Sequence, residues 1–156
     1  MKKLMFGLAV AACAAAFAQP ASATTFPTLT TIYVGAGVRD DGGAENVGIA
    51  TTAVCSNVSG VTTSLRFLVL SPSGAVVGSS TFGTVPHGGT VTLATHATST
   101  FLESLMSTGQ VAQGVVNIES LQSGVFCTAF VVDGFDPVDM APLHLVRINP
   151  HPGTVE

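Results

Sequence analysis

The sequence contains no tryptophan and only one tyrosine, Tyr33. Modules that bind sugars by ring stacking present exposed tryptophan or tyrosine, so this kind of carbohydrate recognition is disfavoured. Only 9% of the residues are charged, and both lysines, Lys2 and Lys3, lie at the N-terminus. Binding to a phosphate backbone needs clustered lysine and arginine, and we therefore expect no nucleic-acid partner.

The N-terminal segment has the pattern of a secretory signal peptide. Lys2 and Lys3 precede an apolar stretch over residues 4–18, and the small-residue triplet Ala21-Ser22-Ala23 follows Pro20. This order of positive, apolar and A-x-A segments is typical of a cleaved signal. We expect residues 1–23 to be removed and 24–156 to form a single exported domain, periplasmic or secreted, in a bacterial envelope.

The same segment admits one alternative. Residues 10–13, ending in Cys13, loosely resemble a bacterial lipobox, which would leave the protein lipid-anchored at Cys13. Against this alternative, the apolar stretch before Cys13 is short, and alanines follow it in place of a polar tether. The apolar run of residues 4–18 is too short to span a bilayer comfortably, and no later apolar run reaches that length. We expect no membrane span, and the mature chain, with three arginines and nine acidic residues, is acidic.

Two cysteines, Cys55 and Cys127, remain after the predicted cleavage. Each lies in a run with period-two alternation, on the face that also carries small or apolar residues, which is typical of an inward strand face. An even cysteine count in an exported chain favours a disulfide. No basic residue that could activate a thiolate lies near Cys127, and no close-spaced ligand pattern favours zinc.

From residue 24 onward, short strand-like runs alternate with turn sequences. The expected strands cover 28–38, 47–56, 62–71, 75–84, 90–96, 111–120, 125–133 and 143–148. Thr100 and Glu103 fit a capping box and Gly109 a C-terminal cap, which predicts one short helix between two strands. This spacing predicts an all-β antiparallel sandwich of seven or eight strands with one short helix and one disulfide.

Residues 82–133 resemble bacterial immunoglobulin-like modules of secreted proteins. The likeness is carried by "PHGGTVTL", the strand "GVVNIES", the turn "LQSG" and the strand "VFCTAFVVD". It implies an immunoglobulin-like β-sandwich that serves as a scaffold without an assigned activity. The separation of the two cysteines is compatible with the bridge between the two sheets of immunoglobulin domains.

Two acidic loops are candidate metal sites. Asp and Gly favour turn geometry, which is one explanation for both loops. Oxygen-rich loops at one end of a sandwich can also bind calcium, and we keep this alternative. The candidate ligands are Asp40, Asp41, Glu45, Asp133, Asp136 and Asp139.

The histidines give no catalytic pattern. No G-x-S-x-G motif links a serine to a histidine, so a serine hydrolase is disfavoured. His87 lies in a Gly- and Pro-rich turn, and His144 alternates with apolar residues, which predicts a partly buried structural histidine. A copper site from Met140, His144 and His151 is a weaker possibility.

The glycines in "YVGAGVRDDGG" lack the spacing of a phosphate loop, and we expect close packing or a bulge there. We conclude that the sequence predicts a non-enzymatic exported module, structural or protein-binding, with a protein partner and no cofactor. The alternative is a calcium- or metal-dependent ligand-binding domain that uses the acidic loops.

Overall fold

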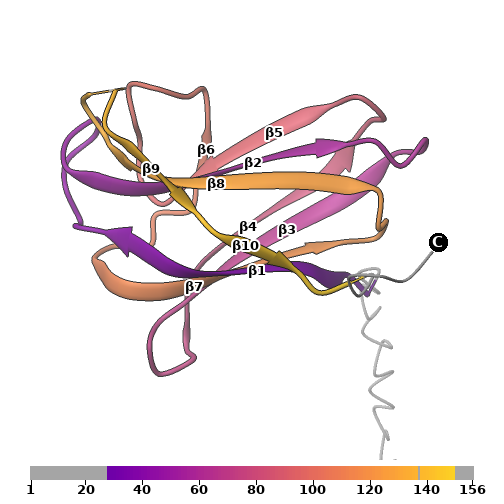
Figure 1. Ribbon diagram of the computed structural model, residues 1–156, viewed down its shortest axis with the longest axis horizontal. Helices are drawn as coiled ribbons and strands as arrows, with labels where there is room; N and C mark the ends of the chain where they lie inside the picture. The colour runs from indigo at the N-terminus through magenta and orange to yellow at the C-terminus, as the bar shows by residue number, and fades with distance from the viewer. Residues whose placement is uncertain (1–27, 137, 150–156) are drawn as a thin grey trace, which may run out of the picture.

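The computed structural model describes residues 28–136 and 138–149, and these form two five-stranded sheets packed face to face (Figure 1). The predicted signal peptide, Cys13 and His151 lie outside the described residues. The ten strands are β1 (Thr30–Asp40), β2 (Ile49–Asn57), β3 (Thr63–Leu70), β4 (Val76–Val85), β5 (Thr90–Ala94), β6 (Ser104–Leu105), β7 (Val111–Ser120), β8 (Val125–Asp133), β9 (Met140–Leu143) and β10 (Leu145–Arg147).

The strand order places the chain in two layers. The β1 sheet has the order β10-β1-β7-β3-β4, and the β2 sheet has the order β6-β5-β2-β8-β9. All neighbouring strands are antiparallel except β5 and β6, which are parallel. The all-β, two-sheet prediction is confirmed.

The number of strands is larger than the predicted seven or eight. The last predicted strand, 143–148, is interrupted at His144, where the chain leaves β8 in one sheet and joins β1 in the other. Figure 1 shows this crossing, with β9 and β10 in yellow running from the upper layer to the lower one. The predicted helix also gives way to a short strand.

That helix, expected over residues 100–109, is absent, and the described residues contain no helix. Glu103 does accept a backbone hydrogen bond, but from Thr98 N–H and outside any helix. The N–H groups of Met106 and Thr108 donate to the carbonyls of Ala94 and Thr95. A helix of two turns is marginal alone, so pairing with β5 replaces it.

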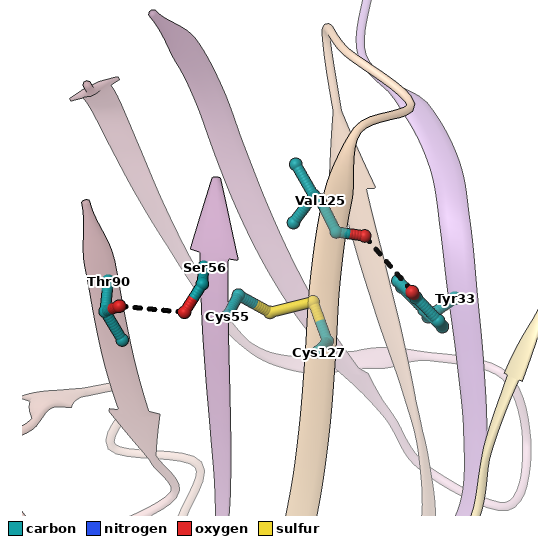
Figure 2. The surroundings of a disulfide bond; sticks show 6 residues. All are labelled: Tyr33, Cys55, Ser56, Thr90, Val125 and Cys127. Carbon is teal, nitrogen blue, oxygen red and sulfur yellow. Dashed lines mark hydrogen bonds between the residues drawn. A yellow bond between two sulfur atoms is a disulfide. The ribbon is translucent and has the colours of Figure 1, made fainter. Parts of the chain in front are cut away.

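The hydrophobic core lies between the two sheets. It is built from the inward residues of both layers, as period-two alternation predicts. Its fully buried members are Val38, Cys55, Leu65, Phe67, Val69, Leu93, Ile118, Val125 and Ala129. The hydroxyl of Tyr33 crosses the layers and donates to the Val125 carbonyl at 3.1 Å (Figure 2).

The bridge between Cys55 and Cys127 is confirmed, but its place in the fold differs from that of the expected inter-sheet bridge. Cys55 on β2 lies directly opposite Cys127 on β8, its neighbour in the same sheet, with Cα atoms 4.2 Å apart. Figure 2 shows the sulfur atoms joining these adjacent strands. The disulfide therefore fixes the register of the β2 sheet instead of tying the two layers together.

Close packing and a bulge explain the glycines of β1, as predicted. A Cβ on Gly35 would lie 2.7 Å from the Leu145 side chain on β10. Gly37 has a φ of 100°, and the register between β1 and β7 shifts between Ala36 and Val38.

None of the described residues form a helix able to cross a lipid bilayer.

Candidate functional site

The first acidic loop joins β1 to β2, and its aspartates bond to their own backbone. Asp41 Oδ1 accepts from Gly43 N–H at 3.0 Å, and Asp41 Oδ2 accepts from Ile49 N–H at 2.9 Å. The bond from Ile49 is the main reason that the pKa of Asp41 is lowered from its ordinary value. Desolvation is the next largest effect and raises the pKa, while the bond from Gly43 and the nearby His96 lower it further.

The second acidic loop, between β8 and β9, also uses its carboxylates to shape turns. Asp133 Oδ1 accepts from Phe135 N–H at 2.8 Å and from Asp136 N–H at 3.1 Å. Asp136 Oδ1 in turn accepts from Val138 N–H at 3.0 Å. These are the side-chain-to-backbone bonds that make aspartate common in turns.

The two loops lie at the same end of the sandwich, where Gly134 N–H donates to the Gly48 carbonyl at 2.6 Å. Their carboxylates nevertheless do not form one group among the described residues. Asp40 and Asp41 lie together with His96, which no sequence pattern had placed at this site. Glu45 is exposed and lies outside that group. Asp133, Asp136 and Asp139 also lie outside it.

We call this group the Asp40 cluster: Asp40, Asp41 and His96, whose potential ligand atoms lie within 4.8 Å of one another. Asp40 is 2% exposed, and its Oδ1 lies 3.0 Å from His96 Nδ1. Gly42 N–H donates to Asp40 Oδ1 at 2.7 Å, and the Thr108 hydroxyl donates to Oδ2 at 3.2 Å. A buried carboxylate needs such donors because desolvation is costly.

His96 joins the cluster from the other sheet. It follows β5, whereas Asp40 ends β1, so the cluster bridges the two layers. Both ring nitrogens of His96 are buried, and neither makes a hydrogen bond among the described residues, although Nδ1 lies 3.0 Å from Asp40 Oδ1. No local pattern in the sequence links His96 to Asp40, and the contact depends entirely on tertiary structure.

The other histidines have ordinary surroundings. His87 Nδ1 accepts from Gly60 N–H at 3.1 Å at the turn after β4. The expected partly buried position of His144 is wrong, because His144 is exposed at the point where the chain changes sheets. Met140 is exposed as well, and His151 of the possible copper set lies outside the described residues.

The two sheets end in four edge strands, and three of them are short. Strands β6, β9 and β10 have two, four and three residues, and β9 contains Pro142. Short edge strands and proline are common means by which proteins prevent unwanted strand pairing. The fourth edge is different.

We call this fourth edge the β4 edge: the open side of Val76–Val85, ten residues long. Its sequence, VVGSSTFGTV, contains no charge and no proline. In the described part of the chain, β4 pairs with β3 alone. The register with β3 shifts near both ends of β4 and is regular from Gly78 to Phe82. This regular, uncharged stretch is a ready template for another strand.

A shallow groove runs beside the β4 edge on the outer face of the β1 sheet. It has a volume of about 640 Å³, and its lining includes Leu68 on β3 with Ser79 and Thr81 on β4. Its lining also includes Arg66, which is paired with Glu119 on β7. The nearest charges are therefore neutralised within the protein.

Comparison with protein-family models, with curated proteins and with solved structures finds no match to this chain.

Proposed function

We propose that this protein is a non-enzymatic, exported module of a bacterial envelope, structural or protein-binding, that binds its partner through the β4 edge. The single observation that carries the proposal is the contrast among the four edges. Three are short or contain proline, and the fourth is ten residues long, uncharged and free of proline. A partner strand added there would gain main-chain hydrogen bonds, and the neighbouring groove would accept some of its side chains.

The chemistry of the reactive residues supports a binding role. Both cysteines of the described chain are joined in a disulfide, so neither is a nucleophile. His87 and His144 are both exposed. His87 lies in the turn after β4, and His144 lies between β9 and β10. A fold with two packed antiparallel layers is compatible with an immunoglobulin-like scaffold, and we keep that assignment as part of the proposal.

The location in the periplasm or outside the cell belongs to the same proposal. Disulfides form and persist in oxidising compartments. The bridge between Cys55 and Cys127 supports such a location, together with the signal-peptide pattern of residues 1–23. Mass spectrometry of protein recovered from the cell envelope tests both features, because it measures the new N-terminus and the oxidation state of the cysteines.

Site-specific photo-crosslinking in intact cells tests the binding role. A photoreactive residue replaces Thr81, which is exposed on β4, or Thr128, which is exposed on β8, a strand with neighbours on both sides. We expect one discrete adduct from position 81, none from position 128, and loss of the adduct when Ser79 is also changed to Lys. Equal labelling from both positions, or no adduct from position 81, would overturn the proposal.

A second candidate function, cation binding, is favoured by the Asp40 cluster. Calcium requires six to eight oxygen ligands, whereas the carboxylates of Asp41, Asp133 and Asp136 already accept bonds from backbone N–H groups. The mixture of an imidazole and two carboxylates fits zinc better. Titration calorimetry with zinc and with calcium tests this candidate, with His96→Gln as the binding-deficient variant and Asp136→Asn as the matched control.

A further inference from the structure

The side chains along the middle of β4 alternate between two faces. Phe82, Ser80 and Gly78 oppose Leu65, Phe67 and Val69 of β3, all of which are fully buried. Directly opposed residues in a sheet point to the same side, so these three β4 residues face the interior. Ser79 and Thr81, which lie between them, are exposed on the outer face.

This alternation determines how β4 can pair with a second copy of itself. A twofold axis perpendicular to the sheet makes the two strands antiparallel, and inward residues must then oppose inward residues. An axis that passes between the Ser80 residues of the two copies satisfies that condition. It places Ser79 opposite Thr81 of the second copy on the outer face, and Gly78 opposite Phe82 on the inner face.

These pairs are compatible in size and polarity. Serine and threonine opposite each other can form a hydrogen bond. The space above Gly78 already holds the methyl group of Thr108, since a Cβ on Gly78 would lie 2.4 Å from Thr108 Cγ2. Phe82 is half-buried, and its ring forms an edge-to-face contact with the ring of Phe67, with centroids 6.1 Å apart. In the pair, the exposed part of this ring would lie against the Thr108 methyl group.

Charge also permits this contact. Self-pairing brings every residue of the strand against the same strand, so a single lysine at the edge would oppose self-association. Residues 76–85 contain none, and Arg66 of β3, which lies opposite Thr81, forms an ion pair with Glu119. A second copy of this edge therefore meets no like-charge repulsion.

We propose that the partner of the β4 edge is the β4 edge of a second copy of this chain, which joins the two β1 sheets into one continuous sheet. This inference rests on the proposed function and names its partner. The contact is isologous, with the same residues on both sides, which is the commonest arrangement in homodimers.

Charge-swap variants test the inference. Ser79 and Thr81 are exposed, so the double variant S79K/T81K leaves the fold of one copy unchanged, which circular dichroism and thermal unfolding verify. In the dimer, the lysine introduced at position 79 of each copy would oppose the lysine introduced at position 81 of the other. We expect analytical ultracentrifugation of the mature protein to show a dimer and the lysine variant to dissociate at least about 100-fold more readily.

The complementary variant S79E/T81E should also be monomeric alone, and an equimolar mixture of the two variants should restore the dimer. The matched control, Gln113→Lys with Thr128→Lys, adds the same charge at exposed positions of β7 and β8 and should dimerise like the original protein. A dimer that the lysine variant leaves intact overturns the β4 pairing.

The outcomes separate this inference from the proposed function. A protein that is monomeric at every concentration, but whose position 81 crosslinks to another protein, overturns the second-copy inference alone. A monomer without any adduct at position 81 overturns both.

Discussion

Asp40 Oδ1, at the end of β1, lies 3.0 Å from His96 Nδ1, just after β5, so this buried contact connects the two sheets. The Asp40 side chain is 1% exposed and that of His96 is 13% exposed. Removal of one partner from a buried pair leaves the other without compensation for its desolvation. The contact should therefore contribute to the stability of the sandwich as well as to the Asp40 cluster.

We expect Asp40→Ala to lower the free energy of unfolding by about 3 kcal/mol, because it removes the partner of His96 and the acceptor of Gly42 and Thr108. Urea unfolding measures the change. A double-mutant cycle with His96→Ala should show that the two losses are not additive. Glu45→Ala, in the same loop but exposed, should change stability by less than about 0.5 kcal/mol. Equal losses for Asp40→Ala and Glu45→Ala would refute the buried contact.

The disulfide closes a separation of 72 residues. In the chain-entropy model, a loop of this length stabilises the folded state by about 4 kcal/mol. We expect the double variant C55A/C127A to lose that amount in urea unfolding. The pairing of β2 with β8 continues on both sides of the bridge, so the variant should keep its strand content.

Circular dichroism measures whether C55A/C127A keeps its strand content. Reduction of the original protein with dithiothreitol should reproduce the loss in stability without any substitution. If neither reduction nor C55A/C127A lowers the midpoint of unfolding, the bridge does not constrain the unfolded chain.

The stability of the protein should depend on pH through Asp41, and the surroundings of this carboxylate determine the direction of that dependence. Its pKa in the folded protein is below the ordinary value of 3.8, chiefly because Ile49 N–H binds the charged form. A lowered pKa contributes stability that is fully present above the unfolded value and is lost as the pH falls through the folded value. Asp41→Asn should therefore be less stable than the original protein at neutral pH, and the difference should shrink below about pH 4.

Urea unfolding of both proteins over the acid range measures this difference, and Glu45→Gln serves as the control for a carboxylate of the same loop. A gap between Asp41→Asn and the original protein that stays constant down to low pH would contradict the role of the Ile49 bond.

Local patterns predicted the strands well where one face is buried and turn residues mark the ends. The bounds of β7 and β8 are those expected, and the inward position of both cysteines follows from period-two alternation. Between the expected strands 62–71 and 75–84, Gly74 N–H donates to the Ser71 carbonyl and closes a turn. In these segments, propensity, burial and turn chemistry all favour the same structure.

Features that depend on which strands become neighbours could not be read from the sequence. Alternation places Cys55 and Cys127 on inward faces of the sandwich, but it does not say whether their strands share a sheet. The same limit applies to His96, whose contact with Asp40 requires the two layers to be packed. The β4 edge is likewise a property of strand order, since the sequence of β4 predicts a strand without saying that it ends a sheet.

The segment between β5 and β7 shows how tertiary contacts override a local signal. The ring of Phe101 stacks on Phe130 of β8, with centroids 6.4 Å apart, and Glu103 accepts the N–H of Thr98. The ring contact holds the segment over the outer face of the β2 sheet, where Ala50 and Thr52 are fully buried, and the bond from Thr98 fixes its local conformation. This packing takes the place of the helix that the capping pattern predicted.

We expect Phe101→Ala to destabilise the protein by about 2 kcal/mol, less than a fully buried phenylalanine, because the ring is half-buried. Hydrogen exchange of the β5 and β6 amides should accelerate in this variant, since the segment is attached through that ring. The adjacent Leu102 is fully exposed and supplies the matched control: Leu102→Ala should change stability by less than about 0.5 kcal/mol. If the two variants lose the same stability, residues 100–105 do not pack on β8, and a local helix becomes the better account of this segment.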